Sequence, residues 1–283
     1  MLVGHTMPET GSTTAVANPL LQALLFDAQT MDVEWQQVLH GVKDGYYGSG
    51  NHERPDENFY YSAGITPDPA RQRIYIAHAD EAKLTTIDFS AQAVKSIEIR
   101  EKQTTIERFL EFILSIGVQP VQAKAANSYV RQALLSQDGS TLYVAGEQNN
   151  MLRKNENELE MISTPLGLEA WDLKTGTRLY VVETNASEIR QGPQGLIVLN
   201  GYDRSSSTYR PFTDIFDPAA AQIAAHLDET YAYATLRLDG ELALVSVYST
   251  DENKTFLGVL NAKALRKELS WAANSYYFWP EFR

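Results

Sequence analysis

The chain has 283 residues and no cysteine. Disulfide bonds, cysteine-ligated zinc, iron-sulfur clusters and thiol nucleophiles are therefore excluded. Its most apolar early stretch, residues 19–26, is too short to span a bilayer and includes Gln22. Residues 1–18 contain no Lys or Arg, which a signal peptide would need. We expect no membrane insertion, and either a cytoplasmic protein or an exported portion of a longer one.

Basic residues are also few, with 24 Lys and Arg against 36 Asp and Glu and a net charge of −12 at pH 7. Nucleic acids and anionic membranes require a positive surface, so this balance argues against both as partners. The 43% of hydrophobic residues is enough for a globular core. Because all-β domains commonly reach this length, we expect residues 1–283 to form a single domain.

The motifs of several enzyme classes are missing. The sequence contains no Gly-x-Ser-x-Gly elbow, no phosphate-binding glycine loop and no dinucleotide-binding fingerprint. No run of His and acidic residues has the spacing of an established metal motif. We therefore name no catalytic residue, no cofactor and no resident metal.

A unit of short strands and tight turns occurs four times, and an incomplete copy with strands over Gln22–Asp27 and Val33–Val38 opens the chain. Each copy has a strand that ends in an acidic residue or Asn, then a short turn and a further strand. These anchors are Asp27, Asp88, Asp172, Asp217 and Asn261. The last two intervals match the roughly 40–50 residues of one propeller blade. The pattern predicts an all-β protein made of four-stranded antiparallel blades.

Three segments resemble the YVTN-type family of β-propellers. Ile74-Tyr75-Ile76-Ala77 and Leu142-Tyr143-Val144-Ala145 are similar to its second strand, and residues 170–176 are similar to its third strand and turn. The third and fourth copies lack the motif Tyr, and none has the full Thr-Asn ending. The resemblance covers residues 59–271 and implies a propeller fold, without any particular chemistry.

About five blades can be counted, and two arrangements remain open. In one, Ser275–Trp279 supplies a first strand and Met1–Gly4 a very short second strand, which closes a five-bladed ring. In the other, the chain is the C-terminal portion of a larger propeller. A ring that stays open exposes blade edges, through which the chain could associate with itself.

Long connections fall at one end of the predicted blades, and this end is expected to bind. They are residues 5–19, 41–58, 101–128, 146–165, 203–212 and 249–255. One contains a capping box, Thr104-Thr105-Ile106-Glu107, followed by apolar residues at helical spacing. We expect an amphipathic helix near 104–116. It either packs on the propeller face or docks a partner or a second copy of the chain.

Aromatic residues gather where first strands begin, as at Phe59, Tyr60 and Tyr61. The loop over residues 44–57 adds glycines, tyrosines and a His. Tyr offers a flat apolar face and a hydroxyl group, which suits sugars, peptides or cofactor rings, although it also packs well between blades. An Arg at the same level could clamp an anion. His78 and His226 are expected to be ordinary hydrogen-bonded residues at strand ends. The candidate ligand-binding residues are Tyr46, Tyr47, His52, Arg54, Tyr60, Tyr129, Arg131, Arg190 and Tyr231.

The sequence favours a non-enzymatic binding scaffold whose elaborated face recognises a protein or a small ligand. The alternative is a hydrolase or lyase that acts on a carbohydrate or lactone with carboxylates in the channel. A third hypothesis is a structural fragment of a larger propeller with no site of its own. Converging carboxyl groups with raised pKa values would favour the enzyme.

Overall fold

The structure, a computed structural model, describes residues 2–6, 20–47, 59–101, 124–155, 158–192, 195–203, 210–227, 230–236, 242–249, 254–261 and 266–272. These residues are built almost entirely of β-strands, with a 3-10 turn at Pro69–Arg71 and no α-helix, so the predicted all-β class is confirmed for them. None of the described elements is a helix that could cross a membrane. The helix predicted near 104–116 and the strand predicted at 275–279 lie outside the described residues.

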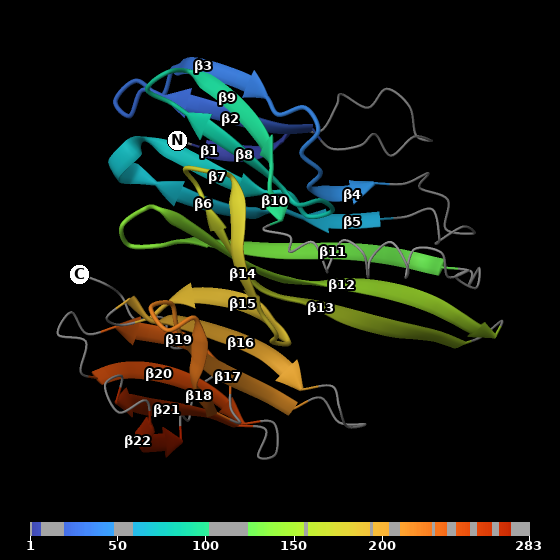
Figure 1. Cartoon of the computed structure of the whole chain (residues 1–283), viewed down its shortest axis with the longest axis vertical. Coiled ribbons are helices and arrows are strands. Elements are labelled where there is room, and N and C mark those ends of the chain that lie inside the picture. The colour runs from blue at the N-terminus through green and yellow to red at the C-terminus, as the bar shows by residue number, and fades with distance from the viewer. Residues whose placement is uncertain are drawn as a thin grey trace. The chain divides into compact units, whose positions relative to one another are not determined.

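The chain divides into two compact units, Met1–Thr184 and Asn185–Arg283. The first unit contains three sheets (Figure 1). Sheet 1 consists of β1 (Leu2–Thr6), β2 (Leu20–Phe26) and β3 (Val33–Val38). Sheet 2 consists of β6 (Gly64–Asp68), β7 (Arg73–Ala77), β8 (Lys83–Asp88) and β9 (Ala93–Glu98). Both sheets are antiparallel and follow chain order.

Sheet 3 has seven strands in the order β10-β14-β13-β12-β11-β5-β4. Its strands are β4 (Gly45–Tyr47), β5 (Phe59–Ser62), β10 (Arg100–Glu101), β11 (Lys124–Leu135), β12 (Thr141–Asn155), β13 (Glu158–Asp172) and β14 (Thr177–Val182). Strands β11 to β14 form an antiparallel meander of four, as predicted. Strands β5 and β10 add to its two edges in parallel.

The second unit contains two four-stranded antiparallel sheets. Sheet 4 consists of β15 (Ala186–Gln191), β16 (Ile197–Asp203), β17 (Arg210–Asp217) and β18 (Gln222–Leu227). Sheet 5 consists of β19 (Thr230–Leu236), β20 (Leu242–Ser249), β21 (Lys254–Asn261) and β22 (Arg266–Ala272). Each is a meander in chain order, so four-stranded antiparallel sheets recur in both units.

The same turn follows four of the predicted anchor residues. In each, the aspartate Oδ1 accepts a backbone N–H from two or three residues ahead, as in Asp172, which accepts from Lys174 and Thr175 at 2.7 and 2.8 Å. Asp27, Asp88 and Asp217 accept in the same way. The fourth residue after each aspartate has a positive φ, and these residues are Met31, Gln92, Gly176 and Ala221. Side-chain acceptors of this kind stabilise tight turns, which explains the repeated anchor.

Sheet 2 is buried on both faces, because successive residues of a strand point to opposite sides. One buried cluster joins it to sheet 1 and comprises Leu21, Ala23, Leu39, Val42, Ala63, Ile74, Ile76, Ile87 and Phe89. A second joins it to sheet 3 and comprises Tyr75, Ala77, Leu84, Ile99, Leu142, Val144 and Trp171. The alternation along β7 therefore supplies both cores, and sheets 1, 2 and 3 pack face to face in chain order.

The loop predicted over residues 146–165 is largely strand, which corrects the sequence analysis. Strands β12 and β13 have 15 residues each and pair almost to their ends, with Asn155 opposite Glu158. The 12-residue β11 also continues into the segment predicted as the connection 101–128. The register shifts at Gly146 and Glu147, where the blade-length part of the hairpin ends. A polar strand extension and a polar loop share a composition, so hydrophobic alternation did not distinguish them.

The strand that should open sheet 2 also differs from the prediction. Phe59, Tyr60 and Tyr61 were expected to begin its first strand, but β5 pairs in parallel with β11 of sheet 3 instead. The chain enters sheet 2 only at Gly64, after a break at Ala63, whose N–H donates to Asp44 Oδ1 at 2.8 Å. The parallel pairing brings together strands far apart in the sequence, which local patterning could not reveal.

Candidate functional site

A stack of tyrosines lines the extension of sheet 3. Tyr61 in β5 and Tyr129 in β11 are register partners, and their rings lie parallel with centroids 5.4 Å apart and planes 6° apart. Tyr47 in β4 meets Tyr61 edge-on at 5.3 Å. Gln148 donates to the Tyr129 hydroxyl at 3.4 Å. Tyr61 is buried, and burial raises its pKa because the phenolate would lose hydration.

A lysine links this stack to the loop between β7 and β8. Lys43 Nζ lies 5.0 Å from the centroid of the Tyr61 ring and 2.6 Å from Asp80 Oδ2. The hydrogen bond to Asp80 raises the pKa of Lys43, so the ammonium group stays charged. A cation over an aromatic face is attracted by the ring quadrupole. Lys43 is 45% exposed, so one side of this arrangement remains open to solvent.

Arg131 lies on the same strand as Tyr129 and is nine-tenths buried. Its Nη1 is 3.5 Å from Glu169 Oε1, and its guanidinium carbon is 5.8 Å from the centroid of the Trp171 ring. Glu169 Oε2 accepts the Trp171 Nε1–H at 2.9 Å and lies 3.5 Å from Arg178. Burial lowers the pKa of Arg131, and the charges of Glu169 and Asp80 oppose this effect. The positive charge of Arg131 therefore interacts with the carboxylate of Asp80, in the β7–β8 loop, and with that of Glu169, in β13.

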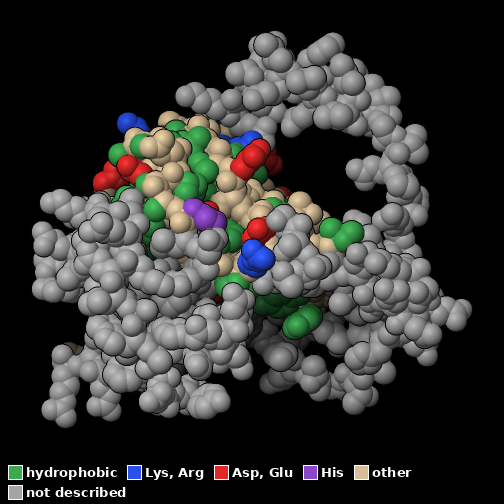
Figure 2. Space-filling view, turned by 90° about the horizontal axis from the view of Figure 1, so that it is seen from below, with side chains coloured by type: hydrophobic (Ala, Val, Ile, Leu, Met, Phe, Trp, Pro, Cys, Tyr) green, Lys and Arg blue, Asp and Glu red, His purple; other side chains and the backbone are tan. Residues whose placement is uncertain are grey.

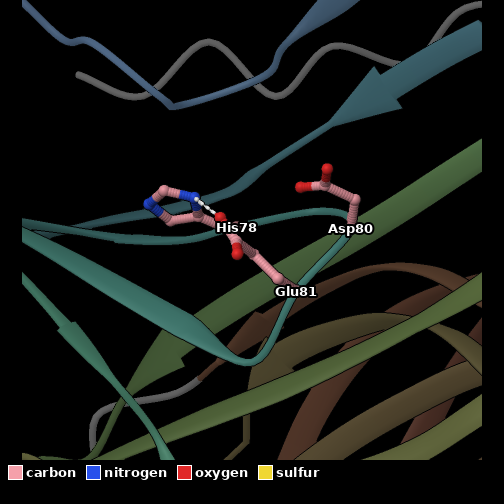
Figure 3. A group of neighbouring side chains, drawn as sticks. All are labelled: His78, Asp80 and Glu81. Atoms are coloured by element: carbon pink, nitrogen blue, oxygen red, sulfur yellow. Dashed lines mark ion pairs between the residues drawn. The ribbon is translucent and has the colours of Figure 1, made fainter.

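The loop between β7 and β8 carries three donor residues, His78, Asp80 and Glu81 (Figure 3). His78 is fully buried, with its Nε2 2.7 Å from Thr85 Oγ1 and its Nδ1 3.4 Å from Glu81 Oε1. Burial lowers the pKa of His78, and Lys83 adds to this, so the ring is neutral at pH 7. The prediction that His78 is hydrogen-bonded is confirmed. The same holds for His226, which contacts Asp214 at 2.7 Å.

His78 directly follows β7, at a position that is glycine within β12 of sheet 3 and β16 of sheet 4. When the sheets are aligned on their turn aspartates, His78 corresponds to Gly146 and Gly201. A Cβ at Gly146 would collide with the backbone oxygen of Val130, and one at Gly201 with that of Asn185. A side chain is therefore excluded at these two positions, whereas the corresponding residue of sheet 5, Val247, lies opposite Tyr231 of β19.

Sheet 2 has room for this histidine because its first strand is short. The pairing of β6 with β7 ends at Gly64 opposite Ala77, one residue before His78. The preceding strand, β5, has moved to sheet 3. The same rearrangement that aligns Tyr61 with Tyr129 thus vacates the space that the His78 ring fills.

The predicted site residues are only partly brought together. Tyr47, Tyr129 and Arg131 lie around Tyr61, whereas Tyr46 and Tyr60 pair with each other at 4.9 Å on the opposite face of the β4–β5 hairpin. Arg190 belongs to the second unit and pairs with Glu188 at 3.0 Å. Tyr231 is the second residue of β19, where the structure describes the backbone. His52 and Arg54 lie outside the described residues.

The sequence analysis missed several residues of this region. Lys43, Tyr61, Asp80 and Glu169 were not among the candidates, although Tyr61 was noted as an aromatic residue at a strand start. Each becomes significant through a partner from another strand or loop. The departure of His78 from a repeated glycine could have signalled the loop, once the copies were aligned residue by residue.

On the face of the molecule drawn in Figure 2, acidic, basic and hydrophobic side chains of the described residues lie interspersed, and neither sign of charge forms a broad patch among them. The exclusion of nucleic acid, which binds to continuous positive surfaces, stays a prediction.

No protein-family model matches the chain, and no curated protein matches it. Among solved structures, the β-propeller domain of Myceliophteria thermophila Cps50 (Swd1) is 14% identical, with 89% of this chain and 69% of that chain covered and a TM-score of 0.48. The Dos1 propeller is 14% identical over 94% and 57%, with a TM-score of 0.45. Hydrazine synthase of Kuenenia stuttgartiensis is 14% identical over 87% and 57%, with a TM-score of 0.42.

The chain thus spans 57% of the length of two of these structures and 69% of the third. Two of the three are propellers by their descriptions, and one is an enzyme. Similarity at this level assigns no activity and no ligand to the chain.

Proposed function

We propose that the chain is a non-enzymatic binding module built from propeller blades in one domain, and that it takes a small polar ligand beside the tyrosine stack. The recurring four-stranded meanders and the face-to-face packing of sheets 1, 2 and 3 support blades. The YVTN-type repeat, the number of blades and self-association through residues 104–116 or open edges stay predictions.

The observation that carries the binding site is a set of buried polar atoms beside the aromatic rings. Among the described residues, Arg131 Nε and Arg131 Nη1 are buried without a hydrogen-bond partner. A buried polar atom without a partner costs about 1–3 kcal/mol, so a ligand that satisfies both gains that free energy. The rings of Tyr61 and Tyr129 supply apolar contact beside these atoms. A ligand with hydroxyl or amide groups on a small ring or chain, such as a sugar or a short peptide, fits this combination.

The hydrolase or lyase alternative has less support. A general acid needs a raised pKa, but Asp27, Asp88, Asp138 and Asp172 have lowered pKa values because turn N–H or hydroxyl groups donate to them. These carboxylates therefore serve turns and do not favour proton transfer. The enzyme hypothesis stays a prediction.

A thermal-shift panel of sugars, dipeptides, amino acids and small organic acids tests the proposal. A ligand at about 100 times its dissociation constant stabilises the folded state by roughly 2.7 kcal/mol, which is several degrees for a protein of this size. The quenching or enhancement of Trp171 fluorescence provides a second signal, because the Trp171 ring lies beside Arg131. Loss of that signal in Trp171→Phe assigns it to this site.

Two tyrosines of the chain form a matched pair of variants. Tyr129→Ala removes a ring of the stack, and we expect it to abolish the shift. Tyr46→Ala removes an exposed ring from the opposite face of the adjacent hairpin, and we expect the shift to remain. A ligand response that survives Tyr129→Ala and disappears in Tyr46→Ala would place binding on the other face and refute the proposed site.

A further inference from the structure

The three donor residues of the β7–β8 loop converge on one point. One ligand atom from each of His78, Asp80 and Glu81 lies within 4.8 Å of the other two. In Figure 3 the carboxylate of Glu81 faces the His78 ring, and Asp80 turns one oxygen to the same side. Ligands at about 2.0–2.2 Å from one ion lie at most about 4.4 Å apart, so a small side-chain rotation within this group would let all three atoms bind one ion.

The His78 ring is held as metal ligands usually are. Its Nε2 contacts Thr85 Oγ1 at 2.7 Å, and Thr85 Oγ1 contacts Ser96 Oγ at 2.7 Å. When Nε2–H donates to Thr85 and the Thr85 hydroxyl donates to Ser96, Nδ1 keeps its lone pair. A metal-binding His almost always donates its second N–H to such an outer partner, which fixes the ring and its tautomer.

Two of the converging atoms also lack hydrogen bonds. Among the described residues, His78 Nδ1 and Asp80 Oδ1 are buried without a hydrogen-bond partner, although the whole His78 ring is inaccessible to solvent. Lys43 binds the other oxygen of Asp80, Oδ2, and so leaves Oδ1 available. A buried nitrogen that has no hydrogen bond and only a 3.4 Å contact to Glu81, with a second carboxylate in the same group, indicates a cation between these residues.

From this arrangement we propose that His78 Nδ1, Asp80 Oδ1 and a Glu81 oxygen bind one divalent transition-metal ion, with water completing the coordination. A nitrogen ligand favours Zn²⁺ or Co²⁺ over Mg²⁺ and Ca²⁺, which prefer oxygen ligands alone. This site goes beyond the proposed ligand binding, because its three ligands come from one loop and do not require the tyrosine stack.

Two lysines oppose the metal, and one of them, Lys43, binds the other oxygen of Asp80. Lys83 Nζ lies 3.4 Å from Glu81 Oε1, the same oxygen that faces His78. Its ammonium group competes with a cation for this carboxylate. Removal of the Lys83 charge should therefore strengthen metal binding. If the loop has only a structural role, the same change should leave metal affinity unaltered.

Calorimetric titration of the EDTA-treated protein with Zn²⁺ tests the site, with Mg²⁺ as the negative control and the visible absorption of Co²⁺ as a second readout. We expect one saturable Zn²⁺ site per chain. Glu81→Gln should weaken it by more than about 100-fold, because loss of an outer partner alone costs about 10–100-fold. Thr85→Val should weaken it by about 10-fold, and Lys83→Gln should strengthen it.

His226→Gln is the matched control, because His226 also contacts a carboxylate, Asp214, but belongs to no described group of three donors. We expect unchanged Zn²⁺ affinity in this variant. Glu81 is half exposed, so Glu81→Gln should melt like the wild type in EDTA. The absence of saturable Zn²⁺ binding, or affinity that is equal in the wild type, Glu81→Gln and Lys83→Gln, would overturn the proposal. A tyrosine-stack variant that keeps the Zn²⁺ site but loses small ligands would separate this site from the proposed function.

Discussion

Tyr61 and Tyr129 stack with their rings nearly parallel because β5 and β11 run parallel with these two residues in register. The pairing joins the strand before sheet 2 to the first long strand of sheet 3. It also positions Tyr61 beneath Lys43, which in turn contacts Asp80. One strand pairing therefore brings together the aromatic and the charged parts of the candidate site.

The first prediction concerns the energy of this stack. Aromatic pairs contribute about 0.5–1.5 kcal/mol beyond the area they bury. We expect a double-mutant cycle with Tyr61→Leu and Tyr129→Leu to give a coupling free energy in this range, measured by urea unfolding. The same cycle with Tyr61→Leu and Tyr202→Leu, an exposed tyrosine of the second unit, should give no coupling. Equal couplings in the two cycles would contradict a direct contact.

The second prediction uses the repeated turn. Gly176 and Ala221 occupy the same place after their aspartates, with φ of 66° and 51°. The left-handed conformation costs an L residue roughly 1–2 kcal/mol, and glycine avoids this cost. Part of the gain is offset, because glycine gives the unfolded chain more conformational freedom. We expect Ala221→Gly to stabilise the protein by about 0.5–1 kcal/mol.

Gly176→Ala should have the opposite effect, because its Cβ would also lie 2.8 Å from Ile97 Cδ1. The control is Ala220→Gly, in the same turn as Ala221 but at a residue without a positive φ. It should destabilise by about 0.5–1 kcal/mol, because glycine then only adds entropy to the unfolded chain. Chemical denaturation measures the free energy of unfolding of all three variants. Stabilisation by both Ala221→Gly and Ala220→Gly would refute the conformational explanation.

The third prediction concerns acid. Hydrogen bonds from the Ser90 hydroxyl, the Ala91 N–H and Arg73 lower the pKa of Asp88 from 3.8 to about 2. A folded-state pKa below the unfolded one adds stability that is complete above about pH 4 and is lost as the pH falls toward 2. We expect Asp88→Asn to be less stable than the wild type at pH 5 and to lose less between pH 4 and 2.

Urea midpoints at pH 5, 4, 3 and 2.5 measure this dependence. Asp138 offers an independent comparison, because Ser136 and Ser140 lower its pKa to about 2 in another turn. Asp138→Asn should reduce the loss of stability over the same pH range, and the double variant should reduce it further. An acid dependence identical to that of the wild type in both single variants would disprove the assignment.

The fourth prediction separates the two members of a buried ion pair. Glu169 neutralises Arg131 and Arg178, whereas Arg131 has one carboxylate within ion-pair distance among the described residues. Removal of one partner leaves an uncompensated buried charge, at a cost of about 3 kcal/mol or more. We therefore expect Glu169→Gln to destabilise by about 3 kcal/mol.

Arg131→Met should cost less, because Glu169 keeps Arg178 and the Trp171 N–H, and Met fills a similar volume. Equilibrium unfolding of both variants and of their combination tests this asymmetry. If Arg131→Met is the more damaging change, the arginine is held by contacts other than Glu169, and the proposed electrostatic arrangement is wrong.

Local features of the fold could be predicted from the sequence. The strand over Val33–Val38 and the turn aspartates Asp88 and Asp172 are where the pattern placed them. A turn depends on the few residues within it, and a strand on its own alternation, so both are visible in a short window of sequence. The prediction of a loop over residues 146–165 was wrong, because the polar strands there lack hydrophobic alternation.

The sequence by itself determined the all-β class, the repeated four-stranded unit and the residues that end its third strands, because these follow from side-chain periodicity and local hydrogen bonds. Only the tertiary structure decided that β5 leaves sheet 2 to pair with β11. That choice creates the Tyr61–Tyr129 stack and makes room for His78 where sheets 3 and 4 carry glycine. The pairing of strands distant in the chain depends on the total free energy of packing and register, which no local pattern encodes.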